Sequence, residues 1–88
     1  MIPEHLRRAI DRYVEHGTPL GGFLTAVICN DLKGALGKAD TVSRASLFDI
    51  VSYCYNEIPS DCWGSPEKMA AWMKERFKPF EEKNNADV

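Results

Sequence analysis

The chain has 88 residues, a net charge of −2 and a pI near 5.6. This length suits one domain, and the hydrophobic share of 44% predicts a folded chain. The slight acidity argues against non-specific nucleic-acid binding, which requires clustered Lys and Arg side chains that displace counterions. Three cysteines without a CxxC pair are not typical of a disulfide scaffold. With no secretory leader and no apolar run of ~20 residues, we expect a cytoplasmic protein that is not bound to a membrane.

The first predicted helix runs from Pro3 to His16. Its apolar residues recur at the spacing of an amphipathic helix and would face the core: Leu6, Ala9, Ile10, Tyr13 and Val14. Gly17 is a natural stop, because glycine adopts the left-handed conformation that often ends helices.

The second predicted helix begins near Thr18–Pro19 and extends to about Leu36. Asn30–Asp31 is a candidate break within it, because both side chains compete for backbone hydrogen bonds. Gly21 and Gly22 fall in its first turn, where each costs roughly 0.5–1 kcal/mol relative to alanine. Two explanations stay open for them, namely close backbone packing and an anion or ligand that approaches the helix N-terminus.

The third predicted helix runs from about Val42 to Glu57, is capped by Asp40 or Thr41, and is ended by Pro59. Its inward stripe is expected to contain Leu47, Ile50, Val51, Cys54 and Ile58, with Phe48 and Tyr55 beside it and with Tyr53 and Asn56 pointing the other way. Because this apolar arc is wide for one small bundle partner to cover, a self-complementary dimer is predicted.

Arg44 lies in the first turn of this third helix, on its apolar side. A cation there opposes the helix dipole. We therefore expect a carboxylate partner, with Asp40 and Asp31 as the candidates.

The fourth predicted helix starts at Ser65 as N-cap, has Pro66 at its first position, and ends at about Lys78 before Pro79. Its inner face is expected to hold Met69, Trp72, Met73, Arg76 and Phe77. No window alternates with period two, so no strand is predicted. The fold class is therefore all-α, a compact four-helix domain over residues 1–78 with short loops and no sheet, followed by a flexible tail over residues 79–88.

The residues that could carry chemistry are scattered. The spacings of the cysteines and of His5 and His16 do not match a zinc site. Cys62, in a loop just before a helix N-terminus, is the best candidate for a lowered thiol pKa, but nothing brings a base to it. We predict no enzyme, no catalytic residues, no metal and no cofactor, and keep a Cys62-dependent enzyme as an alternative.

Binding of a partner or small ligand fits the residues better. The stretch from Tyr53 to Lys68 concentrates aromatic side chains, and aromatic residues with arginine are the usual anchors of interfaces. The predicted binding residues are Tyr53, Asn56, Trp63, Arg44, Gly21 and Gly22. For Trp63 the alternative is a core position that covers the turn between the last two helices.

The order of these motifs resembles a family of small helical proteins encoded in phages and prophages. Three motifs match, namely GGFLTAV beginning at Gly21, YNEIP beginning at Tyr55 and WGSPEK beginning at Trp63. The pairs Asn30–Asp31 and Ala39–Asp40 lie between the first two motifs, and the resemblance covers about residues 2–75. The resemblance implies an accessory protein in the cytoplasm of a host cell and transfers no catalytic residue. It implies a non-enzymatic binding module, expected to be a homo-oligomer, that counters a host defence by binding a host protein or by sequestering a nucleotide-like small molecule. The alternative is a nucleic-acid-associated phage regulator that uses the basic residues of the first or fourth helix.

Overall fold

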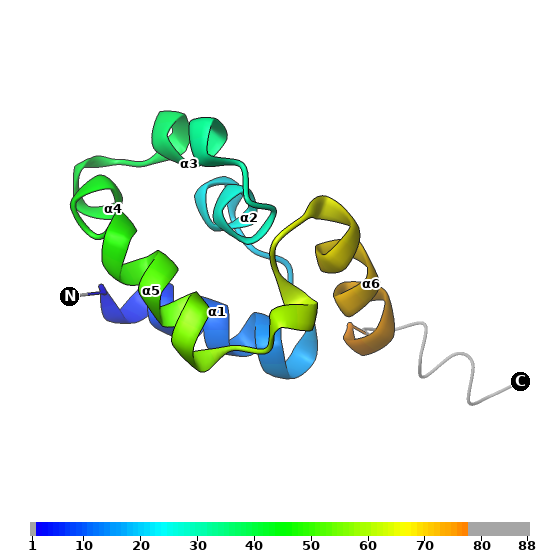
Figure 1. The fold of residues 1–88 in the computed structure, drawn as a ribbon. Helices are drawn as coiled ribbons and strands as arrows, with labels where there is room; N and C mark the ends of the chain where they lie inside the picture. Colours follow the sequence, from blue (N-terminus) through cyan, green and yellow to red (C-terminus); the bar gives the residue numbers. More distant parts are fainter. Residues whose placement is uncertain (1, 78–88) are drawn as a thin grey trace, which may run out of the picture.

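The computed structural model describes residues 2–77, and within them the chain is all-helical. Figure 1 shows the arrangement of the elements. Their bounds are α1 Glu4–His16, α2 Gly22–Ile28, α3 Leu32–Lys38, α4 Thr41–Ala45, α5 Leu47–Glu57, a 3₁₀ turn at Ser60–Cys62, and α6 Pro66–Arg76. The predicted class is confirmed, but the described part has six α-helices rather than four. The predicted tail, Pro79 and the last residue of the fourth helix lie outside the described residues.

The second predicted helix is divided because α2 ends in a complete C-terminal cap. Asn30 has a φ of +64°, and its N–H donates to the carbonyl of Val27 at 3.1 Å. The N–H of Asp31 donates to the carbonyl of Ala26 at 2.8 Å. This pair of bonds is the Schellman arrangement, with asparagine in the place usually taken by glycine. Asp31 then caps α3, where its side chain accepts from the N–H of Gly34 at 3.0 Å.

The third predicted helix is also divided, by a turn at Ser46. Asp40 caps α4 by accepting from the N–H of Ser43 at 2.7 Å, as one of the two predicted caps. Ser46 has a φ of −98° and a ψ near 0°, and it ends α4 and begins α5. The remaining boundaries agree with the predictions: Gly17 ends α1 with a φ of +67°, and Ser65 caps α6 with Pro66 at its first position.

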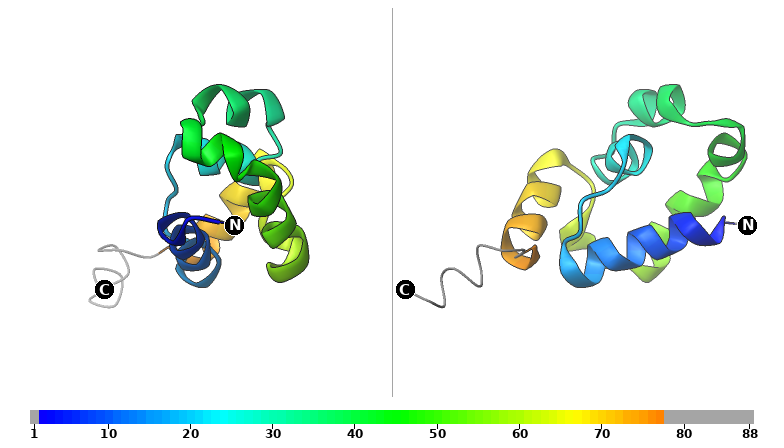
Figure 2. Two further views of the ribbon diagram at one scale, coloured as in Figure 1. Left: turned by 90° about the vertical axis from the view of Figure 1, so that its left-hand side faces the viewer. Right: turned by 180° about the vertical axis from the view of Figure 1, so that it is seen from behind.

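The core lies where α1, α2, α3, α5 and α6 converge with the turn at Ser60–Cys62. In Figures 1 and 2, α1 and α5 run along the same side of the molecule, α2 and α3 stack across them, and α6 covers the C-terminal end of α1. The buried apolar residues come from all of these elements, and the most enclosed are Ile10, Tyr13, Ile28, Ala35, Ile50, Cys54 and Cys62. Burial of such side chains is the dominant favourable contribution to folding.

Hydrogen bonds from two aromatic side chains connect α1 to the turn at Ser60–Cys62 and to α6. The hydroxyl of Tyr13, fully buried on α1, donates to the carbonyl of Cys62 at 2.6 Å. The indole N–H of Trp72 on α6 donates to the carbonyls of Tyr13 and Val14 at 3.2 and 3.1 Å. The guanidinium of Arg76 lies 3.4 Å from the centroid of the Trp72 ring, a cation–π contact. These bonds join segments that are 49 to 59 residues apart in the chain.

The N-cap of α6 provides a first test of this architecture. The hydroxyl of Ser65 accepts from the N–H of Lys68 at 3.1 Å. We expect Ser65→Ala to lower the free energy of unfolding by about 1 kcal/mol, because it removes the acceptor for an otherwise unpaired helical N–H. Urea unfolding followed by tryptophan fluorescence measures the change. Ser65→Asp keeps an acceptor and serves as the control. Equal losses in both variants would show that the cap does not contribute.

Candidate functional site

The six residues predicted to bind do not form one site. Tyr53 packs between α5 and α1 instead of pointing to solvent, and its hydroxyl donates to the carboxylate of Asp11 at 2.5 Å. This hydrogen bond and partial burial raise the pKa of Tyr53, because both favour the neutral phenol. Asp11 also faces the guanidinium of Arg7 at 3.7 Å. Tyr53 therefore has a structural explanation, as a link between two helices.

Asn56 and Arg44 each bond to nearby backbone. The amide of Asn56 donates to the carbonyl of Ser52, one turn earlier on α5, at 2.9 Å. The guanidinium of Arg44 lies 3.5 Å from the carbonyl oxygen of Ala39, to which it donates. The carboxylates expected to pair with Arg44 cap helices instead, because each accepts a backbone N–H at its own helix start.

Gly21, just before α2, and Gly22, its first residue, have different surroundings. Gly21 is the residue before α2, with a φ of −71°, and a Cβ added there would meet nothing within 4 Å. Close packing therefore does not explain Gly21. A Cβ on Gly22 would lie 3.2 Å from Cδ of Lys38, the flexible part of a side chain. α2 has only seven residues, so its aligned peptide dipoles are too few to support an anion-binding site at its N-terminus.

The cysteines are packed rather than activated. Cys62 is fully buried and its thiol donates to the carbonyl of Pro59 at 3.1 Å. Burial raises the pKa of Cys62, so the expectation of a lowered pKa is wrong, because the thiolate would lose its hydration inside the core. The sulfur of Cys29 lies 3.6 Å from that of Met69. Within residues 2–77 no group of three His, Cys, Asp or Glu side chains could hold a metal ion.

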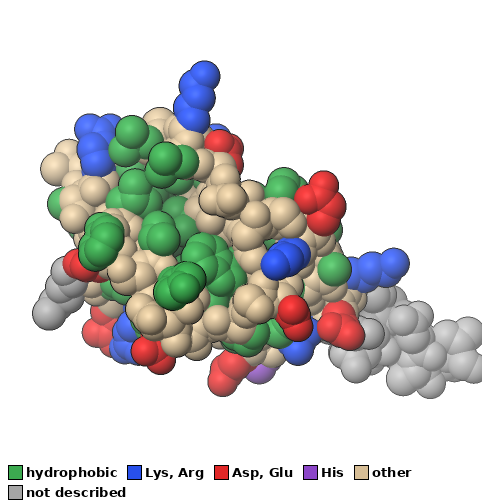
Figure 3. All heavy atoms as spheres, viewed as in Figure 1, with side chains coloured by type: hydrophobic (Ala, Val, Ile, Leu, Met, Phe, Trp, Pro, Cys, Tyr) green, Lys and Arg blue, Asp and Glu red, His purple; other side chains and the backbone are tan. Residues whose placement is uncertain are grey.

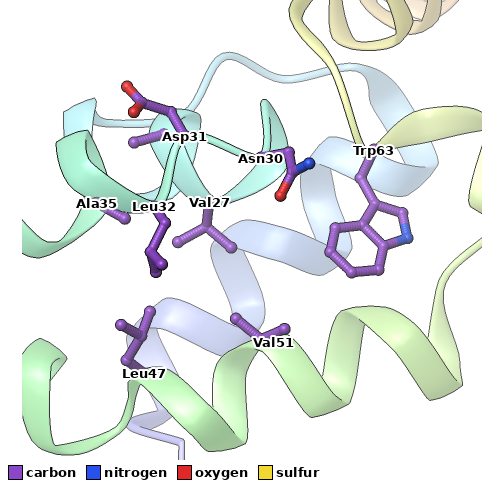
Figure 4. Close-up of a pocket in the computed structure, with 9 residues that line it drawn as sticks. Val27, Asn30, Asp31, Leu32, Ala35, Leu47, Val51 and Trp63 are labelled. Carbon is purple, nitrogen blue, oxygen red and sulfur yellow. The ribbon is translucent and has the colours of Figure 1, made fainter.

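Trp63 lines two hollows of the surface. The first, which we call the α3–α5 hollow, has a volume of about 150 Å³. In Figure 4 the side chains of Leu32, Leu47 and Val51 converge on it from α3 and α5, while the Trp63 ring closes one end. The carboxylate of Asp31 points away from these residues. The lining of the hollow is therefore mostly apolar, with Asn30 and Asp31 as its two polar residues.

The second hollow is the aromatic corner, which we define by Asn30, Tyr55, Trp63 and Lys68. It encloses about 330 Å³, and Ile58, Ser60 and Gly64 complete its lining. Tyr55 is 79% exposed and Trp63 is half-buried. The ammonium of Lys68 lies at its edge, donating to the carbonyl of Ser60 at 3.2 Å. Of the described residues that line this corner, Lys68 carries the single formal charge and none is a carboxylate.

The corner is held in place by backbone geometry. Gly64 has a φ of +119°, a conformation that favours glycine, and its N–H donates to the carbonyl of Ile28 at 2.7 Å. This bond ties the Trp63 loop to the end of α2. The left-handed backbone of Asn30 directs its amide toward Trp63, as Figure 4 shows. Two segments more than 30 residues apart thus meet beside the indole ring.

Three of the four corner residues were not predicted. Tyr55 was placed beside the inward stripe, yet the stripe that is buried on α5 passes through Ile50, Cys54 and Ile58 and leaves Tyr55 outside. The amphipathic pattern has an ambiguous edge there, because Phe48, Val51 and Tyr55 extend it at i, i+3 and i+7. In the sequence, Asn30 was recognised only as part of a candidate helix break. Lys68 was recognised only as a charged residue of the fourth predicted helix.

No family model, curated protein or solved structure matches the chain. The resemblance to phage-encoded proteins therefore stays a prediction. Within the described residues, no helix has the length and apolar character needed to cross a bilayer.

Proposed function

We propose that the chain is a small binding module without catalytic activity, and that it takes up a nucleotide-like small molecule at the aromatic corner. The observation that supports this best is the convergence of Tyr55, Trp63 and Lys68 on one hollow. Aromatic faces stack on nucleobases, and a lysine ammonium attracts phosphate as a point charge. Asn30 adds amide donors and an acceptor for base edges. The corner thus presents the complementary chemistry for a planar, anionic ligand.

The size of the corner agrees with such a ligand. Small-molecule sites span about 300–1,000 Å³, and the corner holds about 330 Å³. Three other surface hollows hold about 400 to 550 Å³, so the lining residues of the corner, and not its volume, distinguish it. The thiols of Cys54 and Cys62 are buried and have raised pKa values, which leaves them poor nucleophiles. Binding without chemistry therefore accounts for the site better than a Cys62-dependent reaction does.

The biological role that we propose follows from the resemblance to phage-encoded proteins. A small protein that retains a nucleotide-like signal would lower its free concentration in the host cell and so counter a defence that depends on it. A host protein is the alternative partner.

Titration calorimetry against a panel of a mononucleotide, a cyclic dinucleotide, a dinucleotide cofactor and an uncharged nucleoside tests this proposal. Tyr55→Ala should weaken binding by about tenfold or more, because base–aromatic stacking is worth ~1–3 kcal/mol. Lys68→Gln should weaken binding of the phosphorylated ligands but not of the uncharged nucleoside, and should reduce the salt dependence. The matched control is Lys74→Gln, an exposed lysine on α6 that does not line the corner.

Native mass spectrometry of protein purified from infected cells of its natural host complements the panel. A retained small molecule, lost in Tyr55→Ala, is the expected result. An absence of binding across the panel together with ligand-free protein from the host would contradict the proposal. A protein partner retained in place of a small molecule would instead favour the alternative.

A further inference from the structure

A second surface, which shares Tyr55 with the aromatic corner, is not covered by any part of residues 2–77. We call it the apolar face and define it by Leu32, Leu36, Phe48, Val51 and Tyr55. Figure 3 shows hydrophobic side chains gathered on this side, over α3 and α5, with charged side chains toward the rim. Phe48 and Tyr55 are each 79% exposed, Leu32 69%, Leu36 46% and Val51 37%. Isolated exposed apolar residues are common, but a contiguous group of this size marks an interaction surface.

The area of this face matches what one protomer contributes to a stable dimer. From their exposed fractions and the ~150–250 Å² of a large side chain, the five residues expose on the order of 600 Å². A standard interface buries about 800 Å² per partner, of which about 60% is apolar. The apolar face would therefore supply the apolar part of such an interface without further residues.

The same face carries both a protruding ring and a hollow to receive one. Phe48 is 79% exposed on α5, and its neighbour Leu47 and Val51, one turn later, line the α3–α5 hollow of about 150 Å³. An apolar cavity of about 150 Å³ accommodates a benzene ring. A two-fold interface requires one patch to be complementary to itself. A surface on which α5 carries an exposed phenyl group and also lines a hollow of phenyl size meets that requirement.

The charges around this face do not oppose self-association. None of the five defining residues carries a charge, so two copies could meet without burying like charges at the centre. Asp31 lines the hollow, but its carboxylate points away from it and accepts from the N–H of Gly34. Burying an unpaired charge would be costly, and this arrangement avoids it.

From these observations we infer that the apolar face is the interface of a two-fold symmetric homodimer, in which Phe48 of each protomer enters the α3–α5 hollow of the other. The occupant of the face is thus a second copy of this chain. The aromatic corner lies at the edge of the interface, because Trp63 lines both hollows. The interface shares Tyr55 with the proposed ligand site, but the inference does not depend on any ligand.

Sedimentation equilibrium of the full chain over a wide concentration range tests the inference. Wild type is expected to approach twice the 9.9 kDa of one chain at high concentration. Phe48→Asp should raise the dimer Kd by about 30-fold or more, as expected for a central aromatic anchor. Val51→Phe should also raise it, because the larger side chain occupies the hollow. The matched control is Val42→Asp, which places the same charge at an exposed valine that is not part of the face.

Circular dichroism confirms that each variant is folded, which is expected because the substituted positions are exposed. A mass of 9.9 kDa at every concentration would overturn the inference and leave the face to a partner of different sequence. A dimer that Val42→Asp weakens as much as Phe48→Asp, or that neither weakens, would overturn it as well. Weaker binding of phosphorylated ligands in Lys68→Gln, a residue of the corner outside the apolar face, together with wild-type dimerisation would separate the two proposals.

Discussion

Gly17→Ala is expected to lower the free energy of unfolding by roughly 2–4 kcal/mol, because left-handed strain and a steric clash add at one position. Gly17 has a φ of +67°, where a Cβ approaches the following carbonyl oxygen. The added Cβ would also lie 2.8 Å from the backbone nitrogen of Phe77 and 3.0 Å from Cβ of Arg76. The end of α6 would have to shift, and with it the bonds from Trp72 to α1.

Gly21→Ala is the matched control for this variant. Its φ of −71° suits any residue, and a Cβ there meets nothing within 4 Å. We expect a change of less than about 1 kcal/mol, because the lower conformational entropy of the unfolded chain with alanine is opposed by the preference for glycine over alanine at the N-cap of α2. Urea unfolding at one fixed protein concentration, followed by tryptophan fluorescence, measures both variants. Similar stabilities for the two would show that α6 does not pack against Gly17 as described.

Alkaline pH is expected to destabilise the fold by several kcal/mol, chiefly through Cys54. Burial raises the pKa of Cys54 to about 12, whereas a thiol in the unfolded chain titrates near 9. Since the folded-state pKa is the higher one, the stabilisation is complete below pH 9 and is lost as the pH rises from 9 toward 12. The loss is about 1.4 kcal/mol per pH unit in this window, or roughly 4 kcal/mol at pH 12.

Urea midpoints measured under reducing conditions between pH 7 and pH 11 test this dependence. Cys54→Val removes the titrating thiol while keeping an apolar side chain, so its stability should fall less steeply above pH 9. A residual slope is expected, because burial also raises the pKa values of Tyr13, Cys29 and Cys62. Parallel curves for wild type and Cys54→Val would show that Cys54 does not carry the effect.

The local signals in the sequence account for most helix ends. Gly17, Asp40, Ser65 and Pro66 act where they were expected to act, because caps depend on a few neighbouring residues and on backbone geometry alone. The inner face of α1 follows from period alone, with Ile10 and Tyr13 fully buried. Asn30–Asp31 was recognised as a candidate break, and the structure places a complete cap there.

The candidate site was much less predictable. Trp63 is the one predicted binding residue that lines the aromatic corner, and its half-buried ring also packs against the core. Tyr53 was expected to point into solvent, but its hydroxyl donates a hydrogen bond to Asp11 of α1, and the side chain is partly buried between the two helices. That contact joins residues 42 apart in the chain, and no local pattern reports it.

By itself, the sequence determined the all-helical class, the amphipathic face of α1 and the caps that begin and end individual helices, since these depend on interactions within one or two turns. Only the tertiary structure decided which side of α5 is buried. Its helical pattern is apolar over a wide arc, and the packing of α1 against Tyr53 encloses one part of that arc and leaves Phe48, Val51 and Tyr55 outside. The aromatic corner arises in the same way, because Asn30 reaches Trp63 only when Gly64 bonds to the end of α2.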